Sequence, residues 1–173
     1  METQFINQYN VTFEMCQEWA NQPIGKSAIY NRKKGIFLRT TMASCSIIII
    51  MLGLLLHEFF CVLFGSVFLI IALNRLFFLP NKIIKQQYNL ILKSLNSNLW
   101  INKITFSDSI IHEAANSTHK YSYSEIIKMA EDRNYFFLFI NEDMVLRIHK
   151  NGFIVGTVDE FREFCNSYIL EQS

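Results

Sequence analysis

Two long apolar stretches, residues 36–56 and 59–79, follow each other with only His57 and Glu58 between them. A bilayer's hydrocarbon core is about 30 Å thick and a helix rises about 1.5 Å per residue, so roughly 20 apolar residues cross it. Each stretch has this length, and Pro80 provides a natural end to the second. The pattern predicts a helical hairpin that crosses a membrane twice. The alternative, buried core helices of a water-soluble domain, is disfavoured because the remaining chain is short for wrapping them.

Basic residues flank both outer ends of the predicted hairpin, whereas the connection between the two spans has none. Lys and Arg are enriched on the cytoplasmic side of membrane proteins. We therefore expect a multi-pass protein of the cell membrane with both termini in the cytoplasm. Long basic side chains near the ends of a span extend to the lipid headgroups. The residues expected at this membrane interface are Arg39, Arg75, Lys82, Lys85 and Lys93.

The segments on either side of the predicted hairpin, residues 36–80, differ in how clearly they can be interpreted. Residues 81–98 have apolar side chains at helical spacing and basic side chains on other faces, which predicts a basic amphipathic juxtamembrane helix. This helix either lies in the headgroup region or continues the second span and packs on the following domain. The N-terminal cytoplasmic segment, residues 1–35, contains a candidate strand within residues 5–13 and a candidate helix within 13–20. Whether this segment joins a sheet is left open.

Residues 99–173 change from a helical to an alternating pattern, which predicts a domain of six short strands with tight turns. Such strands form an antiparallel, strongly bent sheet, and the chain as a whole is a membrane α+β protein. Residues 135–140 are almost continuously apolar, as expected for a strand covered on both faces. A final helix begins at Thr157, with Glu160 completing a capping box. Its apolar stripe, which we expect to close the open side of the sheet, comprises Val158, Phe161, Phe164, Cys165, Tyr168 and Ile169.

The charge of this C-terminal domain limits its partners. The whole chain has a formal net charge of +1, but residues 99–173 carry seven basic and eleven acidic residues, a net of −4. Nucleic-acid binding requires a basic surface, so we expect no nucleic-acid partner. The same charge disfavours recognition of anionic lipid headgroups by this domain.

Residues suited to acid–base or nucleophilic chemistry occur in one region: His112, Glu113, His119, Ser122 and Ser124. They do not match the nucleophile-elbow, zinc-protease or phosphate-loop motifs, and the cysteines lack metal-binding spacing. We therefore expect no catalytic, cofactor or metal site, and we keep a membrane-associated enzyme only as an alternative of another class. Two spans without a polar residue at mid-depth also disfavour a pore.

Several short segments resemble the YcxB-like proteins of bacteria. They are Ile104–Asp108, Tyr123–Ile127 and Ile148–Phe153, the last leading into Asp159–Phe161. The resemblance extends from about Val11 to Leu170. It implies two transmembrane helices in the bacterial inner membrane, followed by a pleckstrin-homology-like barrel closed by a C-terminal helix. It implies no activity that transfers to this chain.

These observations predict a membrane-anchored, non-catalytic interaction module at the cytoplasmic face. The bilayer is one partner, and a protein or peptide bound at a sheet edge or beside the terminal helix is the other. Recognition of lipid headgroups by the domain is the runner-up, and the oligomeric state is open. The residues proposed to bind a partner flank one strand and its following turn: Arg147, His149, Lys150 and Phe153.

Overall fold

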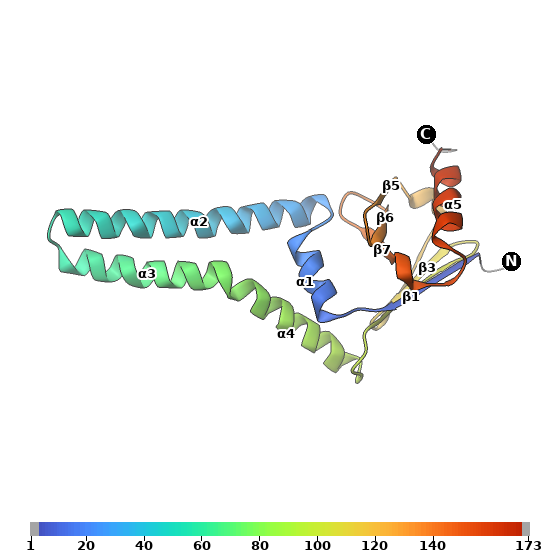
Figure 1. Cartoon of the computed structure of the whole chain (residues 1–173), viewed down its shortest axis with the longest axis horizontal. Coiled ribbons are helices and arrows are strands. Elements are labelled where there is room, and N and C mark those ends of the chain that lie inside the picture. The colour runs from blue at the N-terminus through green and yellow to red at the C-terminus, as the bar shows by residue number, and fades with distance from the viewer. Residues whose placement is uncertain (1–3, 171–173) are drawn as a thin grey trace. The chain divides into compact units, whose positions relative to one another are not determined.

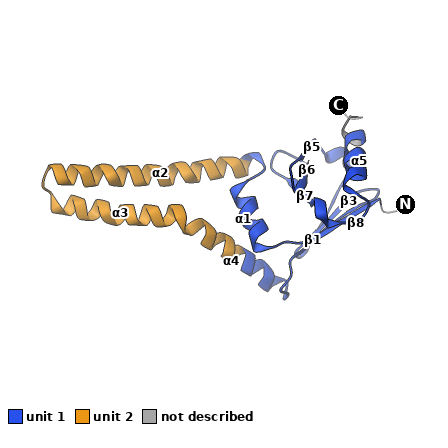
Figure 2. Ribbon diagram, in the orientation of Figure 1, with its two compact units in different colours: residues 1–26, 88–173 blue, residues 27–87 orange. Residues whose placement is uncertain are grey.

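The computed structural model describes residues 4–170, with side chains placed up to Ser167 (Figure 1). The chain divides into two compact units (Figure 2). Unit 1 combines residues 1–26 with residues 88–173, and unit 2 comprises residues 27–87. The residues before and after the apolar hairpin therefore belong to one unit, although the hairpin separates them in the sequence.

Unit 2 contains the predicted hairpin as helices α2 (Lys26–Leu55) and α3 (Phe59–Phe77), followed by the first part of α4 (Leu79–Ser94). Both α2 and α3 are long and apolar enough to cross a membrane. Only 11% of the most apolar 18-residue stretch of each helix is buried. The core helices of a water-soluble protein would be mostly buried. This exposed apolar surface favours a membrane environment for the hairpin.

A tight turn joins the two apolar helices. His57 has a φ of 56°, in the left-handed region, and the Glu58 N–H donates to the Gly53 carbonyl oxygen at 2.8 Å. This is the arrangement of a Schellman motif, which satisfies carbonyl groups at the end of a helix. His57 thus has a structural role in the reversal between α2 and α3.

Small residues allow α2 and α3 to approach closely. A Cβ atom added to Gly65 would lie 2.7 Å from Ile50 Cγ1, and one added to Gly53 would lie 2.8 Å from the Val62 nitrogen. Ser46 on α2 and Ala72 on α3 are also buried. Close backbone packing through small residues is typical of helix pairs in lipid, where dispersion contacts drive association.

Unit 1 is built from two antiparallel sheets. The five-stranded sheet has the order β4-β3-β2-β1-β8, and the three-stranded sheet has the order β5-β6-β7. The strands are β1 (Phe5–Asn10), β2 (Ile101–Phe106), β3 (Ile110–Ala114), β4 (Ser117–Tyr121), β5 (Lys128–Glu131), β6 (Tyr135–Phe139), β7 (Val145–His149) and β8 (Phe153–Val155). The remaining elements are helices α1 (Phe13–Asn21) and α5 (Val158–Leu170) and the 3-10 turns η1 (Tyr123–Glu125) and η2 (Lys150–Gly152).

The prediction of one bent sheet closed into a barrel is wrong, because the strands form two sheets that do not close. Turn η2 carries the chain from the three-stranded sheet to the five-stranded sheet. At this corner the Asn7 side-chain amide donates to the His149 carbonyl oxygen at 2.8 Å. A side-chain hydrogen bond thus connects β1 and β7 where a closed barrel would have backbone ladder bonds.

The N-terminal segment contributes both elements that the sequence left open. Strand β1 pairs with β2 on one side and with β8 on the other. Its side chains alternate, with Phe5, Asn7 and Tyr9 buried. Helix α1 follows directly and is capped by Thr12, whose Oγ1 accepts from the Met15 N–H at 3.3 Å.

The two sheets and α5 enclose an aromatic core. The ring of Phe161, on α5, has its centroid 4.9 Å from that of Phe106 and 5.3 Å from that of Phe136. The predicted capping box is confirmed, because Thr157 Oγ1 accepts from the Glu160 N–H while the Glu160 carboxylate accepts from the Thr157 N–H. Cys165 is buried beside this core, whereas the side chains of Tyr168 and Ile169 lie outside the described residues.

The predicted juxtamembrane helix corresponds to α4, and its last part packs on unit 1. The Tyr88 hydroxyl donates to the Val11 carbonyl oxygen at 3.3 Å, and the Tyr88 ring contacts Phe13 and Trp100. Of the two alternatives for this helix, these contacts favour packing on the domain.

Replacing Gly65 with Val is expected to lower the free energy of unfolding of the hairpin by about 1–3 kcal/mol, because the added side chain collides with Ile50. Gly35→Val is the matched control, since a Cβ atom there would lie 3.6 Å from the nearest atom, Arg39 Nη2. Far-UV circular dichroism during titration of mixed micelles with sodium dodecyl sulfate measures the free energy of unfolding of both variants. Equal effects of the two substitutions would contradict close packing at Gly65.

Candidate functional site

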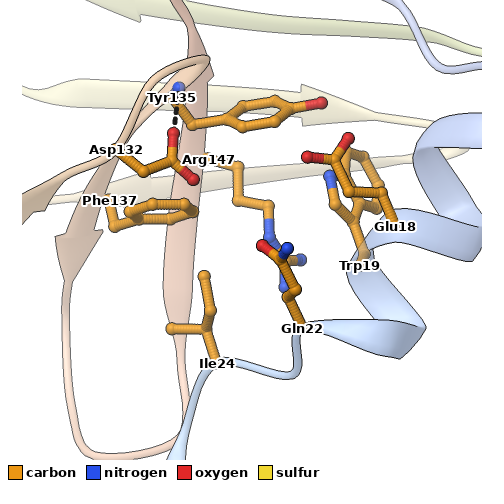
Figure 3. Close-up of a pocket in the computed structure, with 8 residues that line it drawn as sticks. All are labelled: Glu18, Trp19, Gln22, Ile24, Asp132, Tyr135, Phe137 and Arg147. Carbon is orange, nitrogen blue, oxygen red and sulfur yellow. Dashed lines mark hydrogen bonds between the residues drawn. The ribbon is translucent and has the colours of Figure 1, made fainter.

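A small hollow lies over the outer face of the three-stranded sheet, beneath α1 and the residues that follow it (Figure 3). Its volume is about 10 Å³, which is enough for one water molecule or one ligand oxygen atom. Three of the residues around it are aromatic, and one is a cation. The lining residues are Glu18, Trp19, Gln22, Ile24, Asp132, Tyr135, Phe137 and Arg147.

Strand periodicity explains which side chains reach this hollow. Phe136 and Leu138 of β6 point into the core and are fully buried, so Tyr135 and Phe137 face the other side. Arg147 is the cross-strand partner of Phe137 in β7 and shares this outer face. Trp19 on α1 covers the face, with its ring centroid 6.3 Å from that of Tyr135. The prediction that this strand is covered on both faces is confirmed.

Arg147 is a partly buried cation with one unsatisfied donor, its Nε. Its guanidinium carbon lies 4.9 Å from the centroid of the Trp19 ring, a cation–π contact. Its Nε is buried and has no hydrogen-bond acceptor among the described residues. Within the same part of the chain, no carboxylate oxygen lies within 4.0 Å of the guanidinium. Burial lowers the pKa of Arg147, but a guanidinium stays charged at neutral pH.

The acidic side chains at the hollow differ in their availability. Asp132 Oδ1 accepts hydrogen bonds from the backbone N–H groups of Asn134 and Tyr135, at 2.8 and 2.7 Å. Glu18 acts on Arg147 through its charge and partly offsets the effect of burial on the arginine pKa. Two buried donors at the hollow, the Arg147 Nε and the Trp19 Nε1, have no acceptor among the described residues, and an incoming oxygen acceptor would satisfy either of them.

His149 lies close to Arg147 but belongs to the packing between β1 and β6. Its ring centroid is 5.0 Å from that of Tyr135 and 5.5 Å from that of Tyr9. Its Nδ1 accepts from the Asn151 N–H at 3.2 Å. Burial lowers the pKa of His149, which favours the neutral form of its imidazole.

Lys150 and Phe153, the other two residues predicted to bind a partner, do not line the hollow. The Lys150 ammonium lies 2.6 Å from a carboxylate oxygen of Glu131, which also contacts Arg162 at 2.7 Å. The Phe153 ring packs on Phe161 in the core, with centroids 5.2 Å apart. The structure thus gives Lys150 and Phe153 structural contacts, and their binding of a partner stays a prediction.

The residues considered for catalysis lie in three places: Glu113 on one face of the five-stranded sheet, the two histidines on the other face, and the two serines at η1. Glu113 pairs with Lys103 of the neighbouring strand at 3.0 Å, on the face opposite His112. His112 lies directly across from His119. Ser122 and Ser124 hydrogen-bond to each other at the start of η1. Glu113 therefore does not join the histidines.

The five residues predicted at the membrane interface lie on the three helices of the hairpin region. Arg39 is on α2, Arg75 on α3, and Lys82, Lys85 and Lys93 on α4. Their contact with headgroups stays a prediction.

Sequence reasoning found Arg147 but missed Trp19 and Tyr135, the aromatic residues nearest to it. The alternation of β6 indicates that Tyr135 and Phe137 share a face. Nothing in the local sequence indicates that α1 covers this face, because α1 and β6 are separated by the hairpin.

The charge cluster at Glu131 predicts acid sensitivity. Hydrogen bonds from Arg162 first, and from Lys150, lower the pKa of Glu131 from 4.5 to about 2. A depressed pKa in the folded state stabilises the fold above pH 4.5, and this contribution is lost as the pH falls towards 2. We expect the free energy of unfolding to decrease over this interval, and less steeply in Glu131→Gln. Urea titrations of the chain in detergent micelles at several pH values measure the free energy of unfolding. Glu163→Gln, at an exposed position, is the control. If the free energy of unfolding of the two variants depended equally on pH, the prediction would be contradicted.

The contact between Trp19 and Arg147 predicts an energetic coupling. A double-mutant cycle with Trp19→Leu and Arg147→Met is expected to give about 0.5–2 kcal/mol, because the cation is partly desolvated. The control cycle combines Lys128→Met with Phe139→Leu. In this pair the Lys128 ammonium lies 5.6 Å from the centroid of the Phe139 ring, and Lys128 is more exposed than Arg147. Urea unfolding followed by circular dichroism measures both. If the coupling free energy between Trp19 and Arg147 were no larger than that of the control pair, the contact would not stabilise the packing of α1.

Comparison with known proteins finds a family match for one part of the chain. Residues 106–165 match the family model described as YcxB-like protein. No curated protein and no solved structure matches the chain. The matched segment runs from the last residue of β2 into α5, and is shorter than the span from Val11 to Leu170 expected from the sequence. The resemblance to the YcxB-like family is therefore confirmed over these residues, and the chain carries a YcxB-like domain.

Proposed function

We propose that this protein is a membrane-anchored, non-catalytic interaction module. In this proposal α2 and α3 span the cell membrane, both termini lie in the cytoplasm, and unit 1 binds a protein or peptide there. The observation that carries the binding proposal is the Arg147 Nε, a buried donor of a charged group without an acceptor among the described residues.

The membrane part of the proposal is supported by the exposed apolar surface of α2 and α3. It is also supported by the pairing of β1 with β2, because β1 precedes the hairpin and β2 follows it. Strands on opposite sides of a bilayer cannot pair, so the two ends of the hairpin must emerge on one side. The basic residues at these ends favour the cytoplasmic side of a bacterial inner membrane.

The architecture of unit 1 supports a pleckstrin-homology-like arrangement within this proposal. Two antiparallel sheets share one core, and α5 covers it through Phe161. The sheets leave unpaired edges at β4 and β5, where an extended peptide could pair. The resemblance to YcxB-like proteins implied a related arrangement, a pleckstrin-homology-like barrel closed by a C-terminal helix, although the two sheets here do not close into a barrel.

The binding part follows from the energetics of a buried donor. A buried polar group without a partner costs about 1–3 kcal/mol, and a charged group costs more. A ligand oxygen atom that reaches the Arg147 Nε would remove this cost and form a charge-assisted hydrogen bond. The rings of Trp19, Tyr135 and Phe137 line the same hollow, with Tyr135 and Phe137 themselves buried. This combination of one cation with aromatic walls is typical of residues that dominate binding energy at protein interfaces.

The size and charge of the hollow define the group that it accepts. It has room for one oxygen atom, and Glu18 and Asp132 at its rim repel a ligand with several negative charges. A single carboxylate or a main-chain carbonyl of a peptide fits both conditions. Nucleic acids and polyphosphate headgroups do not.

Proximity labelling in cells, with the labelling enzyme fused to the C-terminus of the full chain, tests the topology and the partner together. We expect cytoplasmic proteins among the labelled set, with one or a few partners that the Arg147→Met variant labels at least tenfold less. The control is Lys120→Met, which removes an exposed positive charge from β4 and is expected to retain these partners. Circular dichroism establishes that both variants fold.

Two outcomes would contradict the proposal. Labelling of periplasmic proteins alone would contradict the topology. Identical labelled sets for the wild type, Arg147→Met and Lys120→Met would contradict a binding role for the hollow.

A further inference from the structure

Two of the four histidines of the chain are brought together by strand pairing. His112 on β3 is the direct cross-strand partner of His119 on β4. Directly opposite residues in an antiparallel pair have Cβ atoms about 4.5–5.5 Å apart and point to the same face. This face also carries the buried side chains of Ile110 on β3 and Ile104 on β2, so both imidazoles lie on the inner face of the five-stranded sheet.

A hydrogen bond defines the proton position on His112. Its Nε2 lies 2.7 Å from Oδ1 of Asn102, which is only 6% exposed. An amide oxygen accepts and does not donate, so Nε2 carries the hydrogen and Nδ1 keeps a free lone pair. A histidine that donates one ring N–H to a carbonyl oxygen while the other nitrogen is free has the arrangement of a metal ligand.

His119 lies at the open edge of the same face. Strand β4 is the edge of its sheet, and the His119 side chain is exposed. Its ring stacks on Tyr121, with centroids 6.3 Å apart and planes inclined by 26°. A solvated ion therefore has access to His119, while His112 is partly buried behind it.

We propose that His112 and His119 form a two-histidine site for a divalent transition-metal ion such as Zn²⁺ or Cu²⁺. Imidazole nitrogen suits these ions and does not suit Mg²⁺ or Ca²⁺. Within residues 4–170, no group of three or more His, Cys, Asp or Glu side chains could hold a metal. The remaining coordination positions are therefore open to water or to a donor from another molecule.

Glu113, although adjacent in sequence, does not complete the site because it faces the other side of the sheet and pairs with Lys103. The site is also separate from the hollow at Arg147, which lies on the outer face of the three-stranded sheet. The inference therefore stands independently of the proposed function.

Isothermal titration of the full chain in detergent micelles with Zn²⁺ tests the site. We expect one Zn²⁺ per chain and a dissociation constant at least tenfold higher in His119→Gln and in His112→Gln. The matched control is His57→Gln, which removes a histidine from the turn between α2 and α3 and is expected to bind as the wild type does. His119 is exposed, so its substitution leaves the core intact.

Electron paramagnetic resonance with Cu²⁺ gives a second readout. Two imidazole nitrogens are expected to couple to the ion in the wild type and one in His119→Gln. Equal Zn²⁺ affinity in the wild type and His119→Gln, or absence of binding by the wild type at millimolar Zn²⁺, would overturn the proposal.

Discussion

The pairing of β1 with β2 and β8 is the interaction on which the rest of the structure depends. Strand β1 lies between β2 and β8 in the five-stranded sheet, yet in the sequence the apolar hairpin separates it from the other four strands. Its Phe5 enters the aromatic core and its Asn7 connects the two sheets at η2. A chain shortened to residues 99–173 would leave β2 and β8 without the strand between them. The hairpin is thus an insertion within one domain.

The same connectivity places the candidate binding site next to the apolar hairpin in the sequence. Residues 13–26 lead from β1 to α2 and cross the outer face of β6 and β7 on the way. The side chains that enclose Arg147 from this side, Glu18 to Ile24, therefore belong to the segment immediately before the hairpin. Residues of α4 that follow the hairpin return to unit 1 through Tyr88. The segments that precede and follow the hairpin both make aromatic contacts within unit 1.

Polar groups are placed where the core ends. Inside the sheets, large aliphatic and aromatic side chains fill the space around Phe161. On the inner face of the five-stranded sheet, Asn102 and His112 form a hydrogen bond that satisfies a buried amide oxygen and leaves one imidazole nitrogen free. On the outer face of the other sheet, Arg147 has an aromatic contact and no acceptor at Nε. Each of these two places thus keeps one polar atom, the His112 Nδ1 or the Arg147 Nε, without a hydrogen-bond partner among the described residues.

Local patterns in the sequence determined the apolar hairpin, the alternation of β6 and the capping box of α5, because each depends on residues a few positions apart. They also indicated Arg147 as a candidate, because it lies on a predicted strand that leads into a turn. The two-sheet arrangement, the cover of Arg147 by Trp19 and the pairing of His112 with His119 were decided only by the tertiary structure. Strand register and the packing of α1 depend on contacts between residues far apart in the chain, whose energies have no signature in local periodicity.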